Sequence, residues 1–250
     1  MAEVAVIFFT QSMFNNYPKT RSILSDAYQK IYAEHYKNNR DGATRASSVS
    51  QKMEEWLHKK VAQDLQDGKD KSTLEIGAGT LNQLLYEETQ PYDIIEPFTQ
   101  LFEKSPLLPK IRHIYQDIDD INLDTQYDRI TAIATFEHVL DLPKVVAKSA
   151  ILLKENGTLR VSIPNEGTIL WKLGYTLTTG IEFRLKYGLP YETLMRHEHV
   201  NSAKDVKEIV SYFFGNVKDH SFGLNRHLAF YRFFECAEPQ IDKAKAYLKL

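Results

Sequence analysis

The sequence predicts an α/β fold, in which helices cover a mostly parallel sheet, and three observations support this. Short apolar runs alternate with amphipathic stretches between residues 73 and 164. One of these runs, residues 73–76, leads directly into a turn with glycines at 77 and 79. Two further strand-like runs, residues 213–221 and 228–236, are joined by a short turn near the end of the chain.

The individual elements follow in order along the chain. Apolar spacing of three and four residues predicts amphipathic helices at residues 19–39 and 48–65, separated by the breaker cluster at 38–42. A polar turn at 67–71 then leads to the first strand, and a helix-like pattern starts at Leu81. Beyond it we expect strands at 92–95, 111–115, 130–134 and up to 164, and helices at 97–104, 141–153, 203–212 and 240–250.

Two carboxylates flank the glycine turn and indicate its ligand. Glu75 ends the first strand, and Glu96 ends the next apolar run, 19 residues after Gly77. The dinucleotide fingerprint would place a third glycine where Asn82 stands, which disfavours a pyrophosphate. A negative charge at Glu75 favours a cation, and Glu96 could accept hydrogen bonds from ribose hydroxyls. These features predict binding of S-adenosylmethionine, which has no phosphate and carries an ammonium and a sulfonium.

Five segments resemble, in order, the class I S-adenosylmethionine-dependent methyltransferases of the small-molecule type: residues 75–80, 92–96, 115–118, 127–140 and 152–164. Leu81 stands where a third glycine often follows in that family. The resemblance implies a Rossmann-like seven-stranded sheet, mostly parallel with an antiparallel last strand. It also implies a cofactor site formed by Glu75, Gly77, Ala78, Gly79, Glu96, Pro97, Asp117, Ile118, Thr135 and Phe136. Asp117 could equally be a turn or cap residue, as its neighbours in the sequence are expected to be.

We expect four parts in the chain. Residues 1–69 would form an N-terminal helical cap, residues 70–163 and 202–238 the cofactor-binding core, residues 164–201 a substrate-facing lid, and residues 239–250 a tail. The lid is predicted because long insertions between core elements are often functional covers. In the cap, side chains that could reach the site are Tyr32, His35, Tyr36, Arg40 and Arg45; the alternative is that the tyrosines cover the core and the arginines are solvated.

Three histidines are the catalytic candidates: His138, His197 and His199. A neutral imidazole can accept a proton near pH 7, although each ring could also serve only to fix a loop. Glu137 and His138 could act as acid and base, or could cap the helix expected at 141–153. The His197-Glu198-His199 run lacks the i, i+4 spacing of a zinc motif, so we expect no metal.

The predicted activity is methyl transfer to a hydroxyl or amine of a small molecule, with O-methylation first, on a sugar or quinone precursor. The sulfonium already activates the methyl group, so catalysis needs mainly positioning and removal of a proton. Two alternatives remain: a nicotinamide-dependent oxidoreductase on a similar fold, and a catalytically idle S-adenosylmethionine-binding partner protein.

Composition bears on partners and location. A net charge of −2 over 250 residues disfavours a nucleic-acid partner. The apolar run at residues 4–9 is too short to span a bilayer, so we expect no membrane partner and take the run as a strand or packing arm. An oligomer contact or a membrane touch is its alternative, and a homo-oligomer is one option for the chain. Cys236 is the single cysteine and cannot form an internal disulfide, so we expect a reducing, cytoplasmic location.

Overall fold

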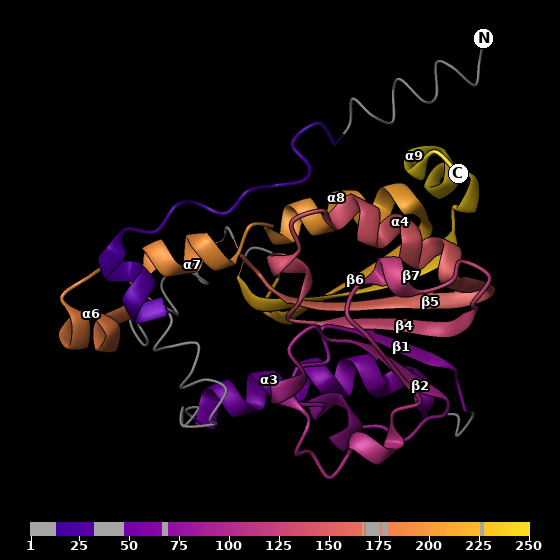
Figure 1. The fold of residues 1–250 in the computed structure, drawn as a ribbon, viewed down its shortest axis with the longest axis horizontal. Coiled ribbons are helices and arrows are strands. Elements are labelled where there is room, and N and C mark those ends of the chain that lie inside the picture. The colour runs from indigo at the N-terminus through magenta and orange to yellow at the C-terminus, as the bar shows by residue number, and fades with distance from the viewer. Residues whose placement is uncertain are drawn as a thin grey trace.

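A computed structural model of the chain describes residues 14–32, 48–66, 70–166, 168, 176, 180–225 and 228–250. Within these residues it confirms the α/β fold: seven strands form one sheet with helices on both faces (Figure 1). The strands are β1 (Thr73–Ile76), β2 (Tyr92–Ile95), β3 (His113–Tyr115), β4 (Tyr127–Ile133), β5 (Leu153–Pro164), β6 (Phe214–Gly223) and β7 (Ala229–Pro239). β7 pairs antiparallel with β5 and β6, whereas the pairs among β1 to β5 are parallel, so the antiparallel last strand is confirmed.

The strand order determines where a ligand can bind. The order is β3-β2-β1-β4-β5-β7-β6, so the direction of the connections reverses between β1 and β4. Open α/β sheets bind ligands at such a switch point, outside the carboxyl ends of the strands. Ile76 is in register with Ala132, which brings the glycine turn after β1 beside the segment that follows β4.

The two faces of the sheet are covered differently. Helices α4 (Leu142–Leu152), α8 (Ala203–Phe213) and α9 (Ile241–Leu248) lie on one face, over the main apolar core, and α3 (Ser48–Ala62) lies on the other (Figure 1). The α8 start is fixed by a capping box, in which Ser202 and Asp205 each bond the other's backbone N–H.

Under α3 the sheet presents buried charge. Arg129 of β4 and Arg160 of β5 are almost completely buried, and both donate hydrogen bonds to the carbonyl of Val61 at the end of α3. Arg129 also forms a salt bridge with Glu87, at 2.7 Å. The last carbonyls of a helix lack intrahelical donors and carry partial negative charge, so the two guanidinium groups anchor α3 on the sheet.

Helices α6 (Ile181–Tyr187) and α7 (Glu192–Glu198) project beyond the sheet, and the helical residues 26–32 of the N-terminal segment lie beside them (Figure 1), whereas Phe14 packs in the main core. They form an apolar cluster of their own, built on Leu24, Tyr28, Phe183 and Leu194, which we call the lid cluster. Part of the N-terminal segment therefore packs with the lid, while α3 packs under the sheet. Several residues of the expected cap and lid lie outside the described residues, including His35, Tyr36, Arg40, Arg45, Trp171 and Tyr175.

Some expected helices are shorter or different in type. Of the described part of residues 19–39, only 26–32 are helical, because residues 19–25 run along the surface of the lid and η6. The helices expected at 81 and at 97–104 are the 3₁₀ turns η2 (Asn82–Leu85) and η3 (Thr99–Leu101). Leu81 has φ of 65°, a left-handed conformation, so Leu81 itself cannot be the first residue of a right-handed α-helix. The remaining turns are η1 (Gln63–Leu65), η4 (Leu108–Lys110), η5 (Ile118–Asp120) and η6 (Phe136–His138).

Among the described helices, none combines the length and the apolar character needed to cross a membrane.

Candidate functional site

The glycine turn after β1 has one packed glycine and one open glycine. Gly77 has φ of 73°, and a Cβ built on it would lie 2.4 Å from Thr135 Oγ1. Gly79 has φ of 52°, and no atom lies within 4 Å of the Cβ position. Ala78, between them, is buried in the cluster under the turn. The backbone at Gly79 therefore faces open space, as a close approach of a ligand requires.

Glu96 supports this turn from β2. Its Oε2 accepts a hydrogen bond from the Gly79 N–H at 2.9 Å, and its Oε1 accepts one from the Phe98 N–H at 2.9 Å. Each carboxylate oxygen has a second lone pair, so the group can still accept bonds from a ligand. Pro97 follows on the exposed side of the turn.

Asp117 and Ile118 follow β3, which pairs with β2 on the side away from β1. The Asp117 carboxylate accepts a bond from the Asp119 N–H and forms a capping box with Asp120, so it is a helix cap as the alternative expected. The side chain of Ile118 is buried. Asp117 remains exposed and could also contact a ligand, because capping uses only part of its acceptor capacity.

Two of the expected cofactor residues have buried side chains. The ring of Phe136 is completely buried in the main core, so only its backbone atoms could face a cofactor, whereas Thr135 before it packs against Gly77. Glu75 is also buried, and it accepts a hydrogen bond from the Tyr92 hydroxyl at 2.9 Å. Burial raises the pKa of Glu75 to about 8 in spite of that bond, so the charge that we assigned to it is largely absent at neutral pH.

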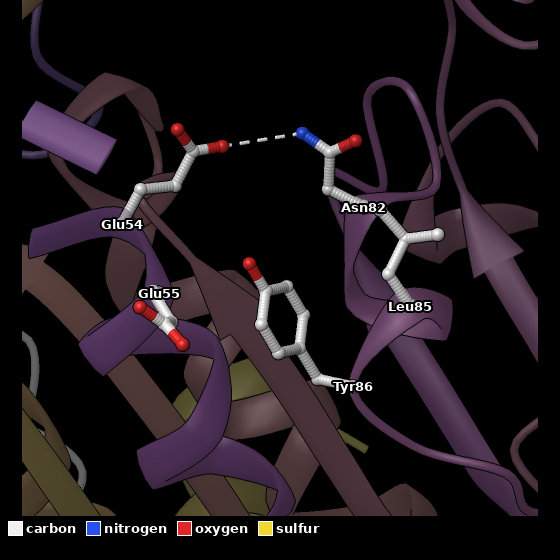
Figure 2. A pocket seen from close by; sticks show the side chains of 5 residues that line it. All are labelled: Glu54, Glu55, Asn82, Leu85 and Tyr86. Atoms are coloured by element: carbon white, nitrogen blue, oxygen red, sulfur yellow. Dashed lines mark hydrogen bonds between the residues drawn. The ribbon is translucent and has the colours of Figure 1, made fainter. Parts of the chain in front are cut away.

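A small cavity of about 320 Å³ lies between α3 and η2 (Figure 2). Glu54 and Asn82 face each other across it and are joined by a hydrogen bond of 3.2 Å, and the Tyr86 hydroxyl points into the space between them (Figure 2). Leu85 and Glu55 complete its lining. The Glu54–Asn82 bond therefore joins α3 to η2 across this cavity.

A cluster of acidic and imidazole groups lies beyond the carboxyl end of β4. His138 and His199 are in edge-to-face contact, with ring centroids 4.6 Å apart. His199 Nδ1 is bonded to Glu166, which follows β5. The carboxylate of Glu137 is only 1 % exposed, and its Oε2 has no hydrogen-bond partner among the described residues. We call Glu137, His138, Glu166, Glu198 and His199 the acid–histidine cluster.

The protonation states in this cluster follow from burial and charge. Burial raises the pKa of Glu137 to about 7, although the charge of His199 opposes the rise. Burial and the charge of His199 lower the pKa of His138 to about 4. Burial alone would lower the pKa of His199, but its bond to Glu166 and the nearby carboxylates outweigh burial and raise it. His199 is therefore the charged imidazole of the pair and His138 the neutral one.

The remaining contacts of His138 fix its orientation. Its Nδ1 lies 3.1 Å from the Glu198 carbonyl oxygen, which can only accept, so Nδ1 carries the hydrogen of the neutral ring. Its Nε2 then has a free lone pair, 4.0 Å from Glu137 Oε1. The side chain of Asp141, the N-cap residue of α4, makes no capping hydrogen bond. The ring nitrogens of His138 do not cap that helix either.

The third predicted histidine is not part of the cluster. His197 Nδ1 contacts the Ser22 carbonyl at 2.7 Å, and its ring packs edge-to-face on Tyr32. The structure therefore brings together two of the three predicted catalytic histidines. It places His197 in the contact between α7 and the N-terminal segment, where Tyr32 also lies.

Sequence reasoning missed three residues that hold this region together. Arg21 donates to the carbonyls of His138, His197 and Glu198, Asn201 donates to the carbonyls of Phe136 and Val139, and Glu166 pairs with His199. Their partners lie far away in the sequence, 176 and 177 residues for two of the Arg21 bonds. No local pattern could have identified them. Among the described residues, no group of three or more His, Cys, Asp or Glu side chains is placed to hold a metal ion.

These residues fit S-adenosylmethionine. The open space over Gly79 lets the cofactor come close to the protein backbone there. Glu96, at the end of the adjacent strand, can still accept hydrogen bonds from the ribose hydroxyls. Bound there, the cofactor would supply an electrophilic methyl group. Two members of the acid–histidine cluster, Glu137 and His138, follow Thr135 in the chain, and Thr135 packs on the glycine turn. The turn and these two residues therefore lie at the same edge of the sheet.

Comparisons with known proteins agree with this geometry. A family model described as a methyltransferase domain matches residues 46–213, more than half of the chain. No curated protein matches the chain in sequence.

Three solved structures share the fold at 12 % sequence identity each. A methyltransferase of Thermotoga maritima, described as a possible histamine N-methyltransferase, has a TM-score of 0.53 over 85 % of this chain and 98 % of its own. The 1,6-didemethyltoxoflavin-N1-methyltransferase of Burkholderia thailandensis, with S-adenosylhomocysteine bound, has a TM-score of 0.55 over 87 % and 92 %. The plantazolicin methyltransferase BpumL has a TM-score of 0.55 over 94 % and 96 %.

The family match leaves the nicotinamide oxidoreductase alternative without support. The chain belongs to the methyltransferase-domain family and is an S-adenosylmethionine-dependent methyltransferase of the class I fold.

Proposed function

We propose that the chain transfers a methyl group from S-adenosylmethionine to a hydroxyl or amine of a small molecule bound against the acid–histidine cluster. One observation carries the proposal: Thr135 packs on the glycine turn, and the cluster residues Glu137 and His138 follow it in the same connection. A methyl donor on the turn and an acceptor at the cluster would therefore be neighbours. Sugar and quinone precursors are acceptors of suitable chemistry to test, and the buried free thiol of Cys236 is compatible with a cytoplasmic setting.

In this proposal Gly77, Ala78 and Gly79 form the cofactor turn, and Glu96 accepts hydrogen bonds from the ribose. Glu75 contributes through its buried bond to Tyr92, which links β1 to β2 under the turn. Pro97, Asp117, Ile118 and Thr135 would line the nucleoside, and Phe136 would contribute only backbone atoms. His138 and His199 would orient the acceptor, and His197 would act through the position of α7.

Calorimetric titration with S-adenosylmethionine, S-adenosylhomocysteine and NAD tests the cofactor assignment. The two adenosyl ligands should bind, and NAD should not. Glu96→Ala should weaken their binding by about 1–3 kcal/mol, the cost expected for hydrogen bonds to a charged group. Glu155→Ala, an exposed glutamate at the start of β5, is the control and should bind normally. Unchanged affinity in Glu96→Ala would remove this residue from the site.

A further inference from the structure

We infer that the acceptor is an amine, and that the buried Glu137 carboxylate binds its N–H and removes its proton. This inference rests on the proposed methyl transfer and names the acceptor class for the same site. It begins with an unsatisfied group: Glu137 Oε2 is buried and has no hydrogen-bond partner among the described residues. A buried polar atom without a partner is costly, and a carboxylate oxygen can only be satisfied by a donor.

The surroundings of Glu137 favour a cationic donor. Charged and titratable groups reach this region from every neighbouring element, and carboxyls outnumber cations among them. They are Glu137 and His138 of η6, Glu198 of α7, Tyr191 at the N-cap of α7, His199 directly after α7, Glu166 after β5, Tyr231 of β7, Glu54 of α3, and Arg21 of the N-terminal segment. The three donor contacts of Arg21 go to backbone carbonyls, and His199 is bonded to Glu166. Neither of these two cations, Arg21 or His199, is therefore hydrogen-bonded to Glu137.

An amine acceptor and a hydroxyl acceptor differ in the charge that each carries after it loses a proton. An ammonium has a pKa of about 10 in water, but burial lowers the pKa of an amine while it raises the pKa of Glu137. A proton can therefore pass from the nitrogen to the carboxylate inside the cluster, and both groups become neutral. A phenol of similar pKa would become an anion among the carboxylates of Glu166 and Glu198, which repel it. An aliphatic alcohol is a far weaker acid, and the neutral His138, whose pKa is about 4, is a weak base for it.

The transfer step then balances. The lone pair of the neutral amine forms the nitrogen–carbon bond as the sulfur–carbon bond breaks, and the electrons of the broken bond remain on sulfur. The positive charge passes from the sulfonium to the methylated nitrogen, so S-adenosylhomocysteine and a methylammonium are formed. Glu137 returns the proton that it accepted to solvent after the product leaves.

The test compares probes that differ only in the donor group. Benzylamine, 2-phenylethylamine and tryptamine are paired with benzyl alcohol, 2-phenylethanol and tryptophol, and p-cresol represents phenols. Binding is measured as the increase in melting temperature of the protein saturated with S-adenosylhomocysteine, and transfer as radiolabelled methyl incorporated from S-adenosylmethionine. Amines should raise the melting temperature and take up label at least tenfold faster than their alcohols or p-cresol.

Glu137→Gln should remove the amine-specific melting shift and lower amine methylation at least tenfold, while S-adenosylhomocysteine still stabilises the variant, which shows that it is folded. Glu137→Asp keeps a carboxylate but shortens the side chain by one methylene, and should keep part of the amine response. Glu155→Gln makes the same chemical change on the surface and should behave as the parent.

The inference is overturned if alcohols or p-cresol bind and react as well as the amines, or if an amine response survives in Glu137→Gln. The absence of an amine-specific shift across the panel would also overturn it. Label transferred only to hydroxyls would overturn the inference and leave the proposed function standing. No transfer to any probe, with cofactor binding intact, would count against the proposed function, and the binding comparison would still decide the role of Glu137.

Discussion

Gly77 and Gly79 adopt the same left-handed backbone for different reasons. At Gly77 a side chain would collide with Thr135, whereas at Gly79 only a ligand would occupy the space. The sequence could predict a turn at these two glycines and the place of Glu96 directly after the next strand, because a strand that leads into a turn is a local feature. It could not predict that Phe136 is core or that Glu75 is uncharged, since both depend on neighbours from other strands.

Alanine at these two positions should therefore have different effects. Gly77→Ala must displace Thr135 as well as strain the backbone, so it should lower the free energy of unfolding by more than the roughly 1–2 kcal/mol of left-handed strain alone. Gly79→Ala should cost about that strain only, yet weaken S-adenosylhomocysteine binding, because the new methyl enters the ligand space. Urea unfolding and calorimetry on both variants measure this. Equal loss of stability in the two would contradict the distinction.

Among the elements, strands were the most predictable because their apolar runs are short and bounded by turn residues. The N-terminal segment was the least predictable. Its apolar spacing indicated one helix over 19–39, but Lys19 and Arg21 bond to groups more than a hundred residues away and hold residues 19–25 in an extended path. Tertiary contacts override local periodicity where several charge-assisted bonds compete with one helical turn.

Arg21 links α7 of the lid to η6, which carries Glu137 and His138, so its loss should act on both. Arg21→Ala removes donors at 2.8, 2.8 and 3.2 Å to His197, Glu198 and His138. We expect faster amide hydrogen exchange over residues 181–199 and a raised KM for the acceptor, with little change in cofactor affinity, because the glycine turn does not contact Arg21. Lys30→Ala, exposed on the adjoining helical segment, is the matched control. Unaltered exchange in the lid would show that Arg21 does not hold it.

At the scale of the whole molecule, one face of the sheet is apolar and the other contains buried polar groups. Core positions under α4, α8 and α9 follow from the hydrophobic pattern, but the buried Arg129 and Arg160 do not, because isolated charges in strands usually indicate solvent. Burial of so many ionisable groups has a consequence for the protein as a whole: their altered pKa values make its stability depend on pH.

Stability should fall as pH rises from 6.5 to 8. Burial raises the pKa of Glu75 from 4.5 to about 8 and that of Glu137 to about 7, so the folded state holds protons that the unfolded state has released. That contribution is complete below the unfolded value and is lost as pH rises through the folded value. His199, whose pKa is also raised, acts in the same direction above 6.5. His138, lowered to about 4, opposes them only between 4 and 6.5.

Urea unfolding at half-unit steps from pH 6.5 to 8 measures this slope. One pKa unit corresponds to about 1.4 kcal/mol, so the total decline should be on the order of a few kcal/mol. Glu75→Gln replaces the buried acid with a neutral amide and should flatten the decline, since Glu75 titrates across this window and its site lies apart from the acid–histidine cluster. Glu155→Gln, fully on the surface of β5, should retain the parent slope. A free energy of unfolding that rises across the window would mean that these carboxyls remain ionised in the folded protein, and the protonation states assigned to the cluster would then have to be reversed.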